Sequence, residues 1–304
     1  MITDKIQEYM QDPDMPKLWE VYAMIADLHA KQQREAYESG YYDKPHATSY
    51  CPTYGCQRQG AYKVHGVEGE AFQWRAHNTF AFGYSIEILV KTQMFLLGIP
   101  FEDRESFPLH WQLDGKPIYC SPDCYNVRPS GDNEFVYVVE IKSASAGSFS
   151  KCASDGVRAT MPGYYDQMQL EITATNSAGA ILVMQNKNTA HLYEEFVEPD
   201  RQRLAELDAY FLTVHDSKPE HFPRALQPIR RVNKIRGKKA PDSLFPLREW
   251  YDKNGKQIGW FEILPEADLP WNCGYCAWKH RCWAPATVTN IAPKGEKPQW
   301  ELRN

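Results

Sequence analysis

Phe135-Val136-Tyr137-Val138-Val139-Glu140-Ile141-Lys142 decides the fold of this chain, because it has the composition of a buried strand that ends in two charged residues. Side chains two residues apart in a strand point to the same face, so Glu140 and Lys142 are predicted to lie side by side. The main-chain carbonyl of Ile141 lies between them. The stretch therefore predicts a core strand with a carboxylate and an amine at its exit.

A second carboxylate stands upstream, in Pro122-Asp123, directly after a strand-like run at 117–120. A turn-forming segment separates this run from the strand of Glu140, so we expect the two strands to pair as a hairpin. Two carboxylates and a carbonyl oxygen are hard ligands of the kind that Mg²⁺ takes. Lys142 beside them is suited to orient an attacking water or to stabilise charge growing on a phosphate. This set of residues predicts metal-dependent cleavage of a phosphodiester.

Helical and strand patterns alternate around these motifs, which predicts an α/β fold. The strands at 107–113 and 117–122 are joined by the turn signal Asp114-Gly115, and with the strand of Glu140 they are expected to form a three-stranded meander. The expected helices cover 16–38, about 78–98, 162–176 and the residues after Pro199, and two further strands cover 180–184 and 191–197.

The chain has 304 residues, 43% of them hydrophobic, so it is long enough to bury a substantial core. Its net charge of −5 gives no general argument for nucleic-acid binding. The segment 222–241 nevertheless contains seven basic residues and no acidic one: Arg224, Arg230, Arg231, Lys234, Arg236, Lys238 and Lys239. Such a segment is either a solvated loop or a surface that follows phosphates, and beside a phosphodiester-cleaving site the second interpretation is favoured.

No run of residues approaches the length of a membrane span, and the N-terminus lacks the features of a signal peptide. We therefore expect a cytoplasmic protein without membrane contact, whose eight cysteines are metal ligands or free thiols. Cys273, Cys276 and Cys282 lie close together, which indicates a soft metal centre. With His280 nearby, Zn²⁺ is one alternative.

The pattern Pro122-Asp123…Glu140-Ile141-Lys142 resembles that of the PD-(D/E)XK nuclease superfamily, and more narrowly the RecB-like exonuclease branch with its CRISPR-associated and phage relatives. The resemblance implies a nuclease core with a mixed central sheet flanked by helices. It implies further that Glu87, in Gly83-Tyr84-Ser85-Ile86-Glu87, is a third acidic metal ligand. It also implies that Gln167 belongs to the site.

Two details of the resemblance stay open. Glu171 stands where the family's glutamine motif has a tyrosine, and Gln169 offers a competing register for the glutamine itself. Lys187, in Asn186-Lys187 after a core strand, matches a position where phage members meet DNA, although a simple turn explains it equally well.

The cysteines resemble those of the iron–sulfur members of this branch, in which one cysteine before the nuclease core joins three after it. Cys56, in a stretch ending at Tyr62, would then complete a [4Fe–4S] cluster with Cys273, Cys276 and Cys282, with Cys51 as the alternative. Such a cluster would join the N- and C-terminal segments. The implied organisation is an N-terminal helical segment (1–75), a nuclease core (76–215) and a C-terminal segment with the basic insertion and the cysteines (216–304).

The function implied is that of a Mg²⁺- or Mn²⁺-dependent DNA exonuclease acting on single-stranded or free ends, in phage recombination or replication or in CRISPR-type processing. Asp123, Glu140, Lys142 and Gln167 would be catalytic, and Glu87, Asp123, Glu140 and Ile141 would hold the metal. Lys187, Arg230, Arg231, Lys234 and Arg236 would contact DNA. A phage-encoded protein would work in the host cytoplasm. The alternatives are a structure-specific endonuclease of the same fold and a catalytically silent iron–sulfur protein that binds DNA.

Overall fold

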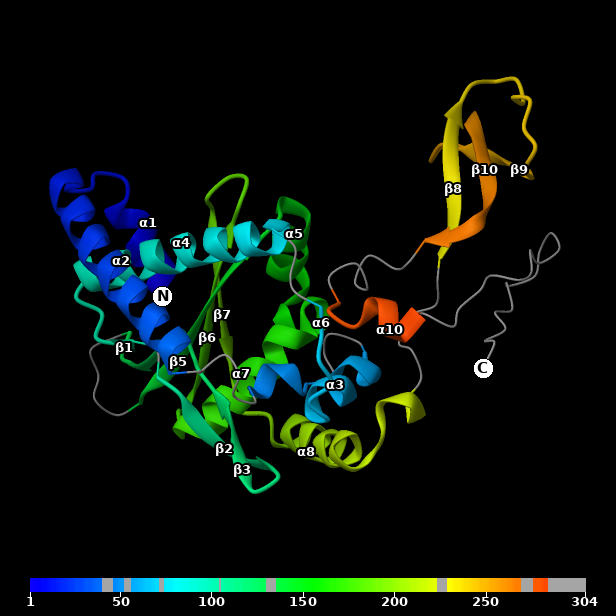
Figure 1. Cartoon of the computed structure of the whole chain (residues 1–304). Helices are drawn as coiled ribbons and strands as arrows, with labels where there is room; N and C mark the ends of the chain where they lie inside the picture. The colour runs from blue at the N-terminus through cyan, green and yellow to red at the C-terminus, as the bar shows by residue number, and fades with distance from the viewer. Residues whose placement is uncertain are drawn as a thin grey trace. The chain divides into compact units, whose positions relative to one another are not determined.

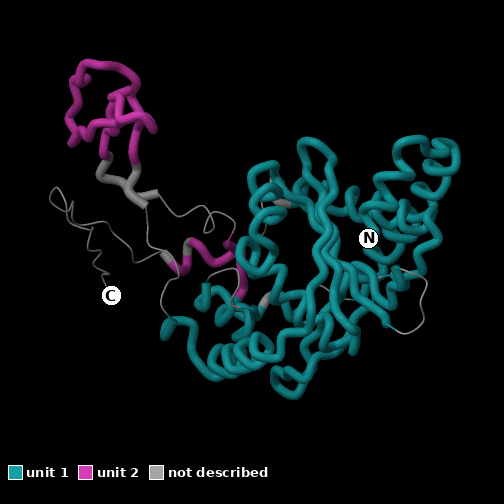
Figure 2. Tube along the Cα trace, turned by 180° about the vertical axis from the view of Figure 1, so that it is seen from behind, with its two compact units in different colours: residues 1–67, 73–223 teal, residues 68–72, 224–304 magenta. Residues whose placement is uncertain are grey.

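A computed structural model describes residues 1–39, 46–51, 56–70, 74–103, 105–129, 135–222, 229–268 and 276–283. The chain divides into two compact units, shown in Figure 2. Unit 1 comprises 1–67 and 73–223, and unit 2 comprises 68–72 and 224–304. The three segments predicted from the sequence have other boundaries and remain a prediction.

Unit 1 is built on a mixed five-stranded sheet of order β1-β4-β5-β6-β7. Its strands are β1 (Glu102–Asp103), β4 (Cys124–Val127), β5 (Tyr137–Ala144), β6 (Gly179–Asn186) and β7 (Leu192–Val197). The central pair, β5 and β6, is parallel, and every other neighbouring pair is antiparallel. Because β5 and β6 are covered on both faces, they need continuous apolar runs, which the sequence supplies.

Helices cover both faces of this sheet (Figure 1). One face packs against α1 (Ile2–Tyr9) and α4 (Trp74–Leu96), with α2 (Met15–Glu38) lying on α4. The other face packs against α5 (Ala146–Asp155), α6 (Val157–Thr160) and α7 (Pro162–Thr175). Alternate residues of β5 divide between the two cores, with Val139 and Ile141 facing α4 and Val138 and Ala144 facing α7. The predicted α/β architecture with a mixed sheet is confirmed.

A further layer of unit 1 packs on α7. It consists of α3 (Gln57–Val64), α8 (Arg201–Asp216), two 3₁₀ turns, η2 (Ala47–Ser49) and η4 (Pro219–His221), and the strands β2 (Phe107–Leu113) and β3 (Lys116–Cys120). The helices predicted at 16–38 and 162–176 are present within a residue of their expected ends. The helix predicted from residue 78 begins earlier, at Trp74. None of the described helices combines the length and the apolar character that crossing a membrane requires.

The predicted three-stranded meander is wrong. β2 and β3 form a separate two-stranded sheet, joined by the predicted turn, in which Asp114 and Gly115 both have positive φ. Asp123 does not end the strand before it; it precedes the short strand β4, and β4 is the antiparallel partner of β5. The sequence pattern missed β4 because the strand has only four residues and an irregular register, with Asn126 at a positive φ.

Unit 2 contains a three-stranded antiparallel sheet of order β8-β10-β9. Its strands are β8 (Ile229–Arg236), β9 (Leu247–Tyr251) and β10 (Gln257–Asp268). The short helix α10 (Lys279–Trp283) follows. Within this unit the Glu70 N–H donates to the Ala277 carbonyl at 2.8 Å, which ties 68–72 to the residues before α10.

Candidate active site

Glu140 and Lys142 lie near the carboxyl end of β5 on the face covered by α7, as their spacing predicted. The Glu140 side chain is fully buried, whereas the Lys142 side chain keeps 21% of its surface exposed. The Lys142 ammonium makes an ion pair with Glu140 Oε1 and lies 5.2 Å from the centre of the Tyr164 ring. This lysine is therefore held by a buried carboxylate while solvent still reaches it.

Asp123 joins this pair through the backbone of β5. Its Oδ2 accepts a hydrogen bond from the Ile141 N–H at 2.8 Å. The register of Cys124 opposite Val139 explains the contact, because it brings the residue before β4 beside Ile141. The expected meeting of Asp123 with Glu140-Ile141-Lys142 is observed, although a different strand produces it.

Helix α7 adds an amide and a third carboxylate to the site. Gln167 Nε2 donates to Glu140 Oε1 at 2.6 Å and to Glu171 Oε1 at 2.9 Å. Glu171 is one helical turn beyond Gln167, so both side chains project from the same side of the helix. Glu171 is fully buried, and its Oε2 is a buried atom without a hydrogen-bond partner in the described part of the chain.

Glu171 was recognised in the sequence only as a departure from the expected tyrosine. The structure makes it part of the acidic cluster. Its spacing of four residues from Gln167 was the available signal.

The buried charges shift one another's pKa values. Burial alone would lower the pKa of Lys142, but the Glu140 carboxylate, with Asp123 and Tyr164 behind it, raises that pKa well above the ordinary lysine value. Burial, reinforced by the negative charge of Glu140, raises the pKa of Glu171 well above its ordinary value. One ammonium thus faces three buried carboxyl groups, and Glu171 responds by holding its proton more tightly.

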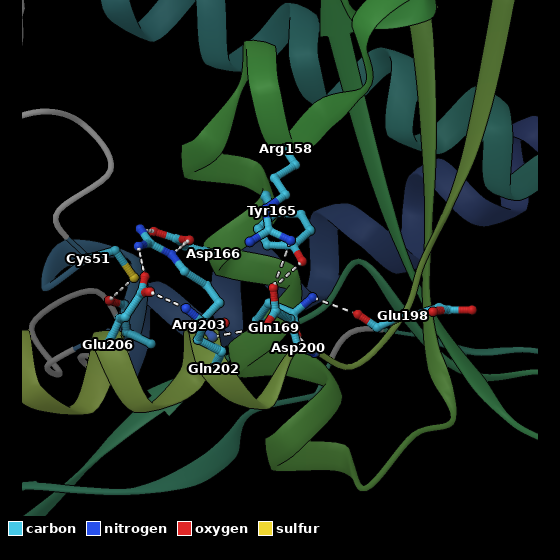
Figure 3. A network of polar contacts seen from close by, with 11 residues as sticks. Cys51, Arg158, Tyr165, Asp166, Gln169, Glu198, Asp200, Gln202, Arg203 and Glu206 are labelled. Carbon is cyan, nitrogen blue, oxygen red and sulfur yellow. Dashed lines mark hydrogen bonds and ion pairs between the residues drawn. The ribbon is translucent and has the colours of Figure 1, made fainter.

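The orientation of α7 is fixed by a polar network with α8, drawn in Figure 3. Arg203 of α8 donates two parallel hydrogen bonds to Asp166, from Nε to Oδ1 at 2.7 Å and from Nη2 to Oδ2 at 2.8 Å. On the other side of Gln167, Gln169 Nε2 donates to the Glu198 carbonyl at 2.8 Å, and Gln169 Oε1 accepts from the Asp200 N–H at 2.7 Å. Because these contacts point Gln169 away from Glu140, Gln167 is the glutamine that reaches the carboxylates.

Glu87 belongs to a second charged network, on the helix that covers the opposite face of the sheet. Its Oε1 accepts from Lys91 Nζ at 2.7 Å and lies 3.9 Å from His29 Nδ1, and the same Nζ lies 2.5 Å from Asp103 Oδ1. Lys91 is 1% exposed. Burial alone would lower its pKa, but Cys124, Glu87, Asp103 and Asp123 raise it. Lys91 and Asp103 were not predicted from the sequence, although the spacing of four residues between Glu87 and Lys91 is the signature of a helical ion pair.

The donor atoms around Glu140 suit a divalent cation in kind. Carboxylates and a carbonyl oxygen are hard ligands, and the buried, unbonded Glu171 Oε2 is an oxygen that a cation would satisfy. The side chains are not arranged as a finished metal site, since no three His, Cys, Asp or Glu groups converge on one position within the described ranges. Residues that would hold a metal are thus Asp123, Glu140, the Ile141 carbonyl and a third carboxylate.

The residues predicted to contact DNA lie in both units. Lys187, in unit 1, is exposed directly after β6, with its Nζ 5.6 Å from the centre of the Phe82 ring. In unit 2, Lys234 and Arg236 are exposed on β8. The side chains of Arg230 and Arg231 lie outside the described part, although their backbones belong to β8.

The cysteines predicted to bind a cluster are described only in part. Cys273 lies outside the described residues, Cys56 is half-buried at the start of α3, and Cys276 and Cys282 lie in unit 2. Cys51 is buried in the core of unit 1, its Sγ donates to the Ala47 carbonyl, and burial raises its pKa, which favours Cys56 over Cys51 as a ligand. The seven described cysteines form no disulfide. Cys120, Cys124 and Cys152 are fully buried core thiols.

Neither a family model nor a curated protein matches this chain. Solved structures match at low identity. An alkaline exonuclease (LHK-Exo) from Laribacter hongkongensis shares 16% identity over 56% of this chain and 85% of its own, with a TM-score of 0.41. A protein called SSO0001 shares 17% over 64% and 89%, with a TM-score of 0.35. A phage-related exonuclease from Haemophilus somnus 129PT shares 12% over 57% and 92%, with a TM-score of 0.36. The likeness is distant, so the functional argument depends on the site itself.

Proposed function

We propose that this protein is a divalent-metal-dependent DNA exonuclease that acts on free or single-stranded ends. The observation that carries the proposal is the buried cluster of Asp123, Glu140 and Glu171 around Lys142 and Gln167. Three carboxyl groups facing one ammonium are costly in a protein interior unless further positive charge arrives. A site of this kind has a function to perform, because packing alone favours apolar side chains there.

The acidic residues of the cluster would bind the metal. Asp123 and Glu140, with the Ile141 carbonyl, would bind the cation, and Glu87 remains the predicted third carboxylate. Glu87 Oε1 accepts a hydrogen bond from Lys91, so a bound cation would share this carboxylate with an ammonium. Glu171 is the alternative, since it already shares Gln167 with Glu140. When bound, Mg²⁺ or Mn²⁺ supplies Lewis-acid activation of the phosphate and lowers the pKa of bound water.

Lys142 and Gln167 act on the water and the phosphate. The high pKa of Lys142 keeps it protonated at neutral pH, so it is a hydrogen-bond donor and an electrostatic stabiliser of the phosphate; it is not the base that removes a proton. Gln167 donates to both glutamates and fixes their orientation, which makes it a positioning residue. Lys187, exposed at the same end of the parallel strands, would contact the DNA backbone.

The proposal is tested with end-labelled linear single strands, linear duplexes and closed circles, incubated with Mg²⁺, with Mn²⁺ or with EDTA. An exonuclease degrades the linear substrates and spares the circle. Cutting of the circle would instead establish the endonuclease alternative. A purified, folded protein that cuts none of them with either metal would overturn the proposal and leave the silent DNA-binding alternative.

The third carboxylate is identified by titrating Mn²⁺ into Glu87→Gln and Glu171→Gln and measuring the heat of binding. The variant that loses affinity by about tenfold or more has lost a ligand. Equal affinity in both variants and the wild type would exclude both residues as ligands.

We also propose that Cys56, Cys273, Cys276 and Cys282 bind a [4Fe–4S] cluster, with Zn²⁺ as the alternative occupant. The support is the cysteine spacing and the burial of the competing Cys51. Quantification of iron, sulfide and zinc in anaerobically purified protein, together with its visible absorbance, decides between them. A protein that contains none of these elements, yet folds and cuts DNA, would contradict both.

A further inference from the structure

In the sheet of unit 2, the charged side chains that the structure describes separate by face. Residues that pair across antiparallel strands point to the same side, so the regular register from Gly259 to Glu262 assigns the side chains paired there. Lys234 of β8 pairs with Phe261 of β10, which pairs with Arg248 of β9. Arg236 similarly pairs with Gly259, which pairs with Trp250. We call the side that carries these residues the basic face.

The opposite side carries the acids. Asn233, Glu262 and Leu247 pair across the strands there, as do Trp260 and Glu249. Glu262 accepts hydrogen bonds from Asn233 at 3.1 Å and from Ser243 at 2.5 Å, and Glu249 accepts one from Tyr251. Glu262 and Glu249 are therefore hydrogen-bonded to neutral side chains on this side of the sheet.

The cations of the basic face are exposed and face solvent. Lys234, Arg236 and Arg248 are all exposed, and no ion pair joins them to a carboxylate in the described ranges. Beside them Trp250 and Phe261 are only half-buried, with ring centres 5.5 Å apart and ring planes inclined by 33°. Lys234 Nζ lies 5.5 Å from the centre of the Trp250 ring. Exposed cations interleaved with aromatic rings are the two components of a surface that binds single strands.

A glycine allows the rings to lie on this face. Gly259 lies between Arg236 and Trp250, and a Cβ there would be 3.0 Å from Trp250 Cε3 and would collide with the Ile235 carbonyl oxygen. Only glycine lets the indole lie across β10. The Trp250 ring is thus placed by its own strand and by its neighbour.

We propose that the basic face binds single-stranded DNA, with bases stacking on Trp250 and Phe261 and phosphates contacting Lys234, Arg236 and Arg248. The choice of DNA rests on the function proposed above, whereas the choice of single strands rests on the rings. A duplex keeps its base faces stacked on one another and offers only its phosphates to such a surface. Unit 2 would accordingly hold single strands irrespective of their sequence.

The test is binding of a fluorescein-labelled oligothymidylate to the full-length protein in EDTA, measured by anisotropy. EDTA prevents metal-dependent cutting, so binding is measured independently of cleavage. A protein that binds the oligonucleotide in EDTA but does not cut it when metal is added would contradict the proposed nuclease activity and leave the binding proposal standing. Trp250→Leu and Phe261→Leu are each expected to weaken binding roughly 5- to 150-fold, the range of one stacked base. Tyr251→Leu is the matched control, since Tyr251 is an exposed aromatic of the same strand on the opposite face.

Three results would overturn the proposal. The first is wild-type affinity in both ring variants. The second is an equal loss of affinity for a blunt duplex in these variants, which would leave only electrostatic binding. The third is tighter binding of the matching RNA than of the DNA oligonucleotide. Lys234→Gln provides a test at an exposed position that leaves the sheet's packing intact. It is expected to weaken binding and to reduce the slope of log affinity against log salt by about 0.7, the value for one phosphate contact with a single strand. An unchanged slope would contradict the contact.

Discussion

Lys142 and Lys91 are two lysines of the same unit, each paired with a buried glutamate, and they differ in what surrounds them. Lys91 is 1% exposed and lies between Glu87 and Asp103, with two carboxylates to share its charge. Lys142 retains 21% exposure and faces Glu140, Asp123 and Glu171. A sealed ion pair serves to hold helix α4 to the edge of the sheet at β1. An ion pair with excess acid and access to solvent is suited to chemistry.

The largest effect is expected from Lys142→Ala. Loss of the ammonium that would stabilise the phosphate should lower the rate of DNA cutting by at least about 10²-fold. Removal of the ammonium takes the paired cation from the buried Glu140, so the free energy of unfolding should also fall, although Gln167 continues to donate to Glu140. Rates are therefore compared at a temperature at which the variant is folded. Initial rates on end-labelled single strands, with circular dichroism as the folding check, measure this. Lys116→Ala, at an exposed lysine of β3, is the control, and a Lys142→Ala rate within tenfold of the wild type would end the assignment.

Lys91→Met should act on stability instead. It removes the ammonium that pairs with both Glu87 and Asp103, at a cost of about 3–5 kcal/mol in the free energy of unfolding. Urea unfolding monitored by tryptophan fluorescence gives the change in the free energy of unfolding. A stable Lys91→Met protein that no longer cuts would reverse the roles assigned to the two lysines.

Glu171→Gln should show its effect in the pH dependence of stability. The folded protein raises the pKa of Glu171 above the ordinary value of 4.5, so the folded state binds this proton more tightly than the unfolded chain. The stability contributed by this group is complete below the ordinary value and is lost as pH rises toward the raised one. The variant has no such loss, so in EDTA it should match the wild type near pH 4 and exceed its stability as pH rises.

Urea midpoints of both proteins across this pH range test that expectation, and parallel curves would contradict it. Added Mn²⁺ should reverse the order if Glu171 is a ligand, since only the wild type then gains the full stabilisation by binding.

The smallest effect is expected from Arg203→Lys. A lysine keeps the charge but cannot make two parallel bonds to Asp166, so α7 should be held less firmly. We expect a loss of about 1–2 kcal/mol in the free energy of unfolding and a several-fold loss of cutting rate through Gln167. An unchanged cutting rate with a lowered free energy of unfolding would show that the Arg203–Asp166 pair stabilises α7 without positioning Gln167.

The local part of the site was predictable from the sequence, and the part set by long-range contacts was not. Strand alternation alone placed Glu140 beside Lys142. Strand alternation does not show whether Gln167 or Gln169 faces the carboxylates. The rotation of α7 about its own axis decides this, and it is set by Arg203 and Asp200 at the start of α8, about thirty residues later in the chain. Charge spacing likewise shows that Glu87 and Lys91 can pair, but the burial of that pair depends on the surrounding fold.

The pairing of strands was the second feature that could not be predicted from the sequence. The pattern identified β2, β3 and β5 but assigned Asp123 to the wrong strand, because β4 is short and irregular. In unit 2 the basic residues were evident from composition, whereas Trp250 and Phe261 were not recognised. Their position beside Lys234 follows from the register of three strands, including an irregularity between Gln257 and Gly259, which no local pattern reveals.

The separation of charge in unit 2 would also affect how the protein approaches DNA, before the two are in contact. With Lys234, Arg236 and Arg248 on one side of a thin sheet and Glu249 and Glu262 on the other, these described charges form an electric dipole directed through the sheet. In the field of a polyanion such a dipole experiences a torque that turns its positive side forward. Orientation would therefore be selected during approach, so exchanging the charges of Arg248 and Glu249 should slow association in addition to hastening release through the lost phosphate contact.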